Sequence, residues 1–198
     1  MKRGMLYIHG KGGSAAEAAH YASLFPEWDV AGLDYRAETP WDAQAEFTAL
    51  YDAFAEKHAR VRLIANSIGA WFALHALGER KPEKAYLISP IADMERLILD
   101  MLGWAQSTEE ELERAGTLET AFGETLSWDY LVWVRKHPIS WSVPTAILYG
   151  SRDHLQSRAS VEAFARRVGA SLTVMEDGEH WFHTEEQMRF LDRWITSA

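Results

Sequence analysis

The sequence contains no cysteine. Disulfide bonds, thiolate metal sites and a cysteine nucleophile are therefore excluded. Basic side chains are also scarce, because 20 Lys and Arg stand against 29 Asp and Glu and give a formal net charge of −9. Proteins that bind nucleic acid need a basic excess to displace counterions. We therefore expect neither a nucleic-acid partner nor binding to an anionic membrane surface.

Long apolar runs are missing as well. No run reaches the roughly 18–20 residues that a membrane-spanning helix requires, and the opening run Met5–Ile8 is too short for the apolar core of a signal peptide. A cytoplasmic protein is expected. The length of 198 residues, with 47% hydrophobic and 25% charged residues, fits a single domain over residues 1–198.

What the sequence does contain is an alternation of short apolar strands with helices. The predicted strands are Met5–Ile8, Trp28–Leu33, Val61–Ala65, Lys84–Ile88, Thr145–Tyr149 and Ser171–Met175. Predicted helices cover Ala15–Leu24, a segment starting at Pro40, Ala70–Leu77 and Gln187–Thr196. Strands separated by helices pair in parallel through right-handed crossovers. The expected fold is a three-layer α/β/α sandwich around a mostly parallel six-stranded sheet.

The stretch at about 91–141 interrupts this alternation, between the fourth and fifth predicted strands. It contains Trp104, Trp128 and Trp133, and an acidic run at Glu109–Glu113 that is typical of the solvated first turn of a helix. A connection of about fifty residues in a compact domain usually has a function of its own. We therefore expect an insertion here.

The segment Ala65-Asn66-Ser67-Ile68-Gly69 joins the third predicted strand to the following helix. A serine at such a junction turns so sharply that the residues two positions away must be small. The turn raises the Ser67 hydroxyl above the sheet edge, at the helix N-terminus, and aims the backbone N–H of Ile68 where an oxyanion would form. The usual pattern is G-x-S-x-G, and this chain departs from it with Ala65, which is still small.

Two further polar residues follow predicted strands. Asp153 comes directly after the fifth strand, and His180 directly after the sixth. The carboxyl ends of parallel strands meet at one edge of a sheet, so Ser67, Asp153 and His180 are expected to converge there. Their order along the chain, Ser then Asp then His, is the order found in hydrolases with a nucleophile elbow.

Asp93 is the alternative acid, because it follows the fourth predicted strand in Ser89-Pro90-Ile91-Ala92-Asp93. The other interpretation of Asp93 is the N-cap of a helix. We favour Asp153 because Tyr149-Gly150-Ser151-Arg152-Asp153 has the tight strand-to-loop form that an acid-bearing turn needs.

A glycine-rich loop, His9-Gly10-Lys11-Gly12-Gly13, ends the first predicted strand. It matches neither G-x-x-x-x-G-K-[ST] nor G-x-G-x-x-G, so neither phosphate-binding pattern is present. His9 is expected to have a structural role, forming hydrogen bonds within the loop.

These motifs, in this order, resemble the α/β-hydrolase superfamily over nearly the whole chain. The chain looks like compact esterase-like members that begin at the strand carrying His-Gly, which implies the fold without its first two strands. The resemblance also implies a helical cap inserted after the strand Lys84–Ile88. The superfamily places a second oxyanion donor just after His-Gly, which implies the backbone N–H of Lys11, with Gly12 as the alternative.

The resemblance implies a serine hydrolase that cleaves a small carboxylic ester or thioester without a cofactor. Ser67 would be the nucleophile, His180 the base and Asp153 the acid that orients it. The expected partner is a small acyl substrate, and no feature specifies an oligomeric state. A carbon–carbon bond hydrolase and a hydrolase-fold binding protein without turnover remain alternatives.

The insertion offers candidates for an acyl pocket, namely Trp104, Trp128 and Trp133. The other interpretation is that these aromatic side chains attach the cap to the sheet. A metal site is not expected, because His180 and His183 with Glu186 nearby lack an H-E-x-x-H helix or a second cluster of ligands.

Overall fold

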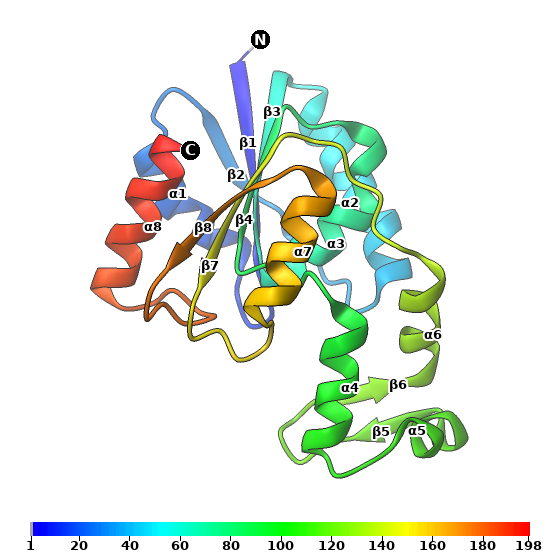
Figure 1. The fold of residues 1–198 in the computed structure, drawn as a ribbon. Helices are drawn as coiled ribbons and strands as arrows, with labels where there is room; N and C mark the ends of the chain where they lie inside the picture. The colour runs from blue at the N-terminus through cyan, green and yellow to red at the C-terminus, as the bar shows by residue number, and fades with distance from the viewer. Residues whose placement is uncertain (1) are drawn as a thin grey trace. The chain divides into compact units, whose positions relative to one another are not determined.

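The computed structural model describes residues 2–198, so that Met1 lies outside the described residues. One sheet of six parallel strands, in the order β2-β1-β3-β4-β7-β8, forms the centre of the fold (Figure 1). The strands are β1 Lys2–Ile8, β2 Asp29–Gly32, β3 His58–Asn66, β4 Lys84–Ile88, β7 Thr145–Gly150 and β8 Ser171–Met175. The predicted sheet is confirmed, although β1 and β3 begin earlier than the apolar pattern indicated.

Helices cover both faces of this sheet. They are α1 Ala18–Leu24, α2 Pro40–Ala55, α3 Ser67–Ala76, α7 Arg158–Val168 and α8 Glu185–Ser197, with short 3-10 turns at Ala15–Glu17 and Gly78–Arg80. Helices α1 and α8 lie on one face, and α2, α3 and α7 on the other (Figure 1). The three-layer prediction is thereby confirmed, and α7 is an addition to it.

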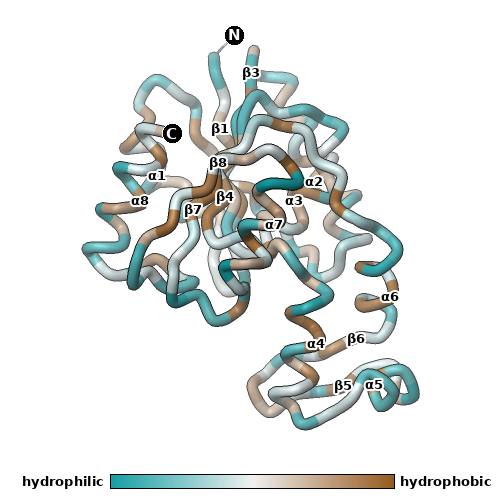
Figure 2. The backbone as a smooth tube through the Cα atoms, viewed as in Figure 1, coloured by the Kyte–Doolittle hydropathy of each residue, from teal (hydrophilic) through white to brown (hydrophobic). Residues whose placement is uncertain are grey.

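The central strands are apolar on both faces, as expected for a covered parallel sheet. Every residue of β7 is buried, and so are Met5–Ile8 of β1. Figure 2 shows apolar residues along β7 and β8. Helix α8 packs Leu191, Trp194 and Ile195 into the same core cluster as β1 and β4. None of the helices over residues 2–198 is long and apolar enough to cross a membrane.

The described chain divides into two compact units. The sheet unit runs to Ala92 and resumes at Ser140–Ala198, and the insertion unit is Asp93–Ile139. Trp141 lies in the sheet unit, where it is buried and its Nε1 donates a hydrogen bond of 2.8 Å to Thr145 Oγ1. The insertion unit therefore corresponds to the interior of the stretch at about 91–141.

The insertion unit is not purely helical, which corrects the expectation of a helical cap. It contains α4 Met94–Trp104, α5 Glu109–Ala115 and α6 Trp128–Lys136, and also an antiparallel hairpin of β5 Thr117–Glu119 and β6 Thr125–Ser127. Strands of three residues are too short for a visible alternation of apolar and polar residues. The hairpin turn at Gly123, with φ of 85°, is the one local signal for it.

An ion-pair network and a small apolar core stabilise the insertion unit. Leu112, Leu126 and Leu131 are buried. Arg135 of α6 donates hydrogen bonds to Glu95 of α4 (2.7 Å) and to Glu109 of α5. The acidic run on α5 is therefore partly paired, not simply solvated.

Truncation of Phe47 tests how much the aromatic packing on the α2 and α3 face stabilises the sheet unit. Phe47 is fully buried, with ring centroids 4.7 Å from Tyr35 and 5.9 Å from Phe72. We expect Phe47→Ala to lower the free energy of unfolding by about 3–5 kcal/mol, because it leaves a cavity. The control is Leu50→Ala on the same helix, which is 36% exposed and should change stability by less than about 1 kcal/mol. Equal losses in urea unfolding would contradict the prediction.

Candidate active site

Ser67 sits at the junction between β3 and α3 in a strained backbone conformation. Its φ is 50°, in the left-handed region that residues other than glycine rarely adopt. A Cβ at Gly69 would lie 2.1 Å from the carbonyl oxygen of His9, so only glycine fits there. Ala65 occupies the other small position and is fully buried. The elbow predicted from the sequence is present, and it requires glycine on one side of Ser67 only.

The start of α3 presents backbone donors at this elbow. Asn66 is the N-cap residue, and Ser67 and Ile68 are the first two residues of the helix. The first N–H groups of an α-helix have no acceptor within the helix and lie at the positive end of its dipole. The N–H of Ile68 is one of these groups, and its role as an oxyanion donor stays a prediction.

Ser67, His180 and Asp153 are joined by hydrogen bonds. Ser67 Oγ lies 2.8 Å from His180 Nε2, and His180 Nδ1 lies 2.6 Å from Asp153 Oδ2. A carboxylate can only accept, so Nδ1 carries the proton and Nε2 is left to accept the Ser67 hydroxyl. The arrangement can therefore take a proton from Ser67, as a general base requires.

The Asp153 side chain is completely buried, and that of His180 is 12% exposed. The second carboxylate oxygen, Oδ1, accepts the backbone N–H groups of Leu155 (2.8 Å) and Gln156 (3.1 Å). Both oxygens of the buried carboxylate are therefore satisfied, and its orientation toward His180 is fixed.

Backbone contacts between two loops place Asp153 and His180. After β7, the N–H of Ser151 donates to Met175 O (2.9 Å) and that of Arg152 to Gly178 O (2.8 Å). A Cβ at Gly150 would lie 2.4 Å from Gly178 O, so the loops can approach this closely only with glycine at that position. Backbone hydrogen bonds therefore hold the loop that carries Asp153 against the loop that carries His180.

Asp93, the alternative acid, has another role in the structure. It is the N-cap of α4, where its Oδ1 accepts the backbone N–H of Arg96 at 3.0 Å. Of the two candidates, Asp153 is the one that contacts His180.

The glycine-rich loop forms a tight turn beside Ser67. The N–H of Gly13 donates to Gly10 O (3.1 Å), and Gly12 has φ of 76°, as the third position of a type II turn requires. A Cβ at Gly10 would lie 3.0 Å from Ser67 Cβ, so the turn runs directly against the serine. Lys11, whose N–H was predicted to be the second oxyanion donor, occupies the second position of this turn.

His9 contacts the Gly10–Gly13 turn and packs beside it, which agrees with the structural role expected for it. Its Nδ1 lies 2.8 Å from Gly10 O, and its ring stacks on Tyr35 at a centroid distance of 4.3 Å. The Tyr35 hydroxyl donates to His9 O at 2.8 Å.

Gln156 is a supporting residue that sequence analysis missed. It is buried, and its Oε1 accepts the N–H of Ala92 at 2.9 Å, while its carbonyl accepts the Tyr149 hydroxyl at 2.9 Å. Its own N–H donates to Asp153. A glutamine three residues after the acid has no distinctive pattern, so the sequence alone gave no signal for it.

The three tryptophans predicted to line a pocket all lie in the insertion unit. Trp104 ends α4, is 49% exposed and meets Phe122 edge-on at 6.0 Å. Trp128 begins α6, and Trp133 of the same helix stacks on His137 at 4.2 Å. Their role in binding stays a prediction.

No group of three or more potential metal ligands occurs within residues 2–198. His183 stacks its ring on Trp181 and lies 2.8 Å from the Trp181 carbonyl oxygen. The His180, His183 and Glu186 set considered from the sequence is therefore not assembled as a metal site.

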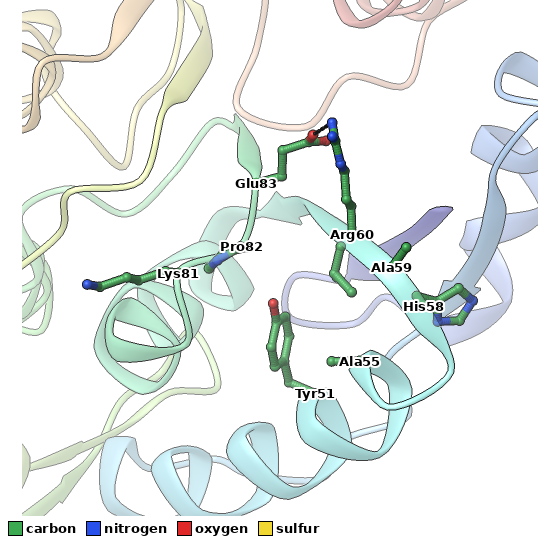
Figure 3. A pocket seen from close by; sticks show the side chains of 9 residues that line it. Tyr51, Ala55, His58, Ala59, Arg60, Lys81, Pro82 and Glu83 are labelled. Atoms are coloured by element: carbon green, nitrogen blue, oxygen red, sulfur yellow. Dashed lines mark hydrogen bonds and ion pairs between the residues drawn. The ribbon is translucent and has the colours of Figure 1, made fainter. Parts of the chain in front are cut away.

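A pocket of about 270 Å³ opens at the amino end of β3 (Figure 3). Tyr51, Lys81 and Glu83 contribute to its walls, and Arg60 pairs with Glu83 at 2.9 Å. Ser67 follows the carboxyl end of the same strand, which places the pocket roughly 25 Å away at about 3.3 Å per residue. It contributes nothing to the hydrogen-bonded set at Ser67.

No protein-family model and no curated protein sequence matches the chain, but many solved structures do. Est1E from Butyrivibrio proteoclasticus superposes with a TM-score of 0.80 at 17% identity, covering 99% of this chain and 86% of that one. A second structure of Est1E, with ferulic acid bound, has a TM-score of 0.78 at 14% identity, covering 98% of this chain and 87% of that one.

Mouse alpha/beta hydrolase domain-containing protein 10 superposes with a TM-score of 0.76 at 18% identity, covering 98% of this chain and 88% of that one. For a lipase-esterase related protein from Clostridium acetobutylicum the TM-score is 0.68 at 14% identity, with 98% and 93% covered. Likeness over nearly the full length of each chain, together with the parallel sheet and the serine elbow, leads to one conclusion: this chain has the α/β-hydrolase fold.

Proposed function

We propose that the protein is a serine hydrolase that cleaves a small carboxylic ester or thioester through an acyl-enzyme. The observation that carries the proposal is the hydrogen-bonded chain from Ser67 Oγ through His180 to Asp153, with Ser67 on a strained elbow at a helix N-terminus. The names of the similar structures, which include an esterase, support the same class of chemistry.

The reaction follows from the roles of these groups. His180 Nε2 takes the hydroxyl proton as Ser67 Oγ attacks the acyl carbon, and the N–H groups of Ile68 and Lys11 receive the oxyanion. The tetrahedral intermediate collapses, and the alcohol or thiol leaves with the proton from His180. Water then attacks the acyl-enzyme with His180 again as base, which releases the carboxylic acid and restores Ser67. Asp153 keeps Nδ1 protonated throughout.

The proposed substrate is a small acyl compound, and its acyl group sets the choice of probes. Est1E has been crystallised with ferulic acid, an aromatic acid. Esters of aromatic acids therefore belong in the test panel beside p-nitrophenyl esters of straight-chain acids and acyl thioesters of graded length. Turnover of diketones in place of esters would favour the carbon–carbon hydrolase alternative.

A fluorophosphonate probe tests the assignment of Ser67. We expect one equivalent to add to the wild-type protein and none to Ser67→Ala, whose kcat should fall by roughly 10³–10⁶-fold. Ser89→Ala is a matched control, because Ser89 also follows a strand, has φ of 43°, and its Oγ has no hydrogen-bond partner within residues 2–198. Labelling that survives in Ser67→Ala and disappears in Ser89→Ala would contradict the proposal.

Substitution of each acid by its amide tests the assignment of Asp153. Asp153→Asn should lower kcat about 10⁴-fold, because the amide would hold His180 in the wrong tautomer. Asp93→Asn should leave kcat within a few-fold, since asparagine is an equally good N-cap for α4. Steady-state kinetics on one ester measures both. The reverse result would make Asp93 the acid.

Truncation of Trp133 tests the proposed acyl pocket. If this side chain contacts the acyl group, Trp133→Ala should shift the preferred chain length or raise KM, with each lost methylene contact worth about 0.8 kcal/mol, or roughly fourfold in kcat/KM. The control is Trp28→Ala, immediately before β2, where the Arg62 guanidinium lies 4.5 Å from the centroid of the Trp28 ring. The substrate profile of this control should not change. A folded Trp133→Ala protein with the wild-type profile would show that Trp133 does not line the pocket.

A further inference from the structure

Glu17 lies directly beneath the Gly10–Gly13 turn. Its Oε1 accepts the backbone N–H of Ser14 at 3.0 Å, and Ser14 is the residue that follows the turn. A Cβ at Gly13 would come within 2.8 Å of the same Oε1 atom, so the carboxylate is packed against the turn itself. The sequence marks Glu17 as the glutamate of an ordinary capping box whose N-cap is Ser14. Its second oxygen has a different partner.

That partner is the hydroxyl of Tyr7, which donates a hydrogen bond to Glu17 Oε2. Tyr7 is in β1, two residues before His9, and is 1% exposed. Burial, followed by the hydrogen bond to Glu17, raises the pKa of Tyr7, so that Tyr7 remains a neutral phenol that can donate. A phenylalanine would fill the same apolar space, and the hydroxyl adds only the polar contact.

Tyr7 also lies beside the strand that leads to the serine elbow. Tyr7 of β1 pairs with Ile64 of β3, and Ile8 pairs with Ala65, in parallel register. Strand β3 ends at Asn66, which immediately precedes Ser67 and is the N-cap residue of α3. A continuous chain of contacts thus runs from β3 through Tyr7 and Glu17 to the N–H of Ser14.

This chain joins the two segments that hold the proposed oxyanion donors. The Ile68 N–H belongs to the elbow and that of Lys11 to the Gly10–Gly13 turn. These segments lie far apart in the sequence, so their spacing must be set by contacts in the folded protein. Two donors serve one oxyanion only when both are placed within about 0.5 Å of the productive geometry.

We propose that Tyr7 and Glu17 are positioning residues that set the spacing between the Lys11 and Ile68 N–H groups. This inference rests on the proposed serine-hydrolase function. It adds two positioning residues to the set of Ser67, His180 and Asp153. Neither side chain contacts substrate: Tyr7 is buried below the turn, and Glu17 acts through Ser14. Their contribution is made through backbone geometry.

The test compares Tyr7→Phe and Glu17→Gln with Tyr21→Phe. Tyr7→Phe removes the hydroxyl, and Glu17→Gln leaves one acceptor oxygen where Glu17 has two, so that the Tyr7 hydroxyl and the Ser14 N–H can no longer both donate to residue 17. Both changes nearly keep side-chain size. Tyr21 is the matched control: it is buried in the same cluster, with its ring 5.0 Å from that of Tyr7. Each protein is assayed for kcat and KM on one ester and for Ki of a trifluoromethyl ketone, which forms a tetrahedral oxyanion on the serine.

Tyr7→Phe and Glu17→Gln should each lower kcat about tenfold, a part of the 10²–10³ that one oxyanion donor supplies. KM should stay within about twofold, and Ki should rise by the same factor as kcat falls, because only the tetrahedral species uses both donors. The double variant should be no worse than either single one, since both break the same chain. Tyr21→Phe should keep wild-type values.

Loss of activity with unchanged Ki, or an equal effect in Tyr21→Phe, would overturn the proposal and indicate a general packing role. If Tyr7→Phe fails to fold, Glu17→Gln, at an exposed residue, decides the question alone. Variants with wild-type kcat and Ki in an active protein would overturn the positioning role and leave the proposed function intact. A wild-type protein that neither hydrolyses esters nor forms a Ser67 adduct would overturn both.

Discussion

The backbone of Ser67, at φ of 50°, is the constraint on which the arrangement of the site depends. A non-glycine residue in this region costs about 1–3 kcal/mol and persists only when its surroundings prevent relaxation. Here the surroundings are close backbone contacts: His9 O leaves no room for a side chain at Gly69, and Gly10 lies against Ser67 Cβ. The two glycines let the first loop and the elbow approach each other, and that approach holds the serine in its strained form.

The position of Asp153 also depends on close backbone contacts, and in addition its buried negative charge must be compensated. The Asp153 side chain is completely buried, and an unpaired carboxylate in that position would be strongly unfavourable. Three donors compensate it: His180 Nδ1 and the N–H groups of Leu155 and Gln156. Because two of them are backbone groups of its own loop, the carboxylate stays oriented toward the imidazole whatever occupies the site.

The sequence predicted those parts of the fold whose signal is local. Six apolar runs gave the six strands, and strand-end positions gave Ser67, Asp153 and His180. Helix α7 was missed although Val161, Phe164 and Ala165 have helical spacing between Ser157 and Gly169. The β5–β6 hairpin, the Gln156 contacts and the Tyr7–Glu17 bond could not be predicted, because each depends on three-residue strands or on side chains that meet only after folding.

Burial of helix α3 has two effects at Ser67. It preserves the strained backbone conformation, and it strengthens the helix dipole that would stabilise negative charge there. Most of the helix is buried, including Trp71, Phe72 and Leu74. Burial keeps the helix from shifting, so the elbow cannot relax by moving it, and it also removes solvent that would screen the helix dipole. The positive end of that dipole points at Ser67, where negative charge would develop as the hydroxyl loses its proton. A strained serine on an exposed, mobile helix would have neither property. In the proposed reaction, the apolar sequence of α3 therefore contributes to the chemistry as well as to the core.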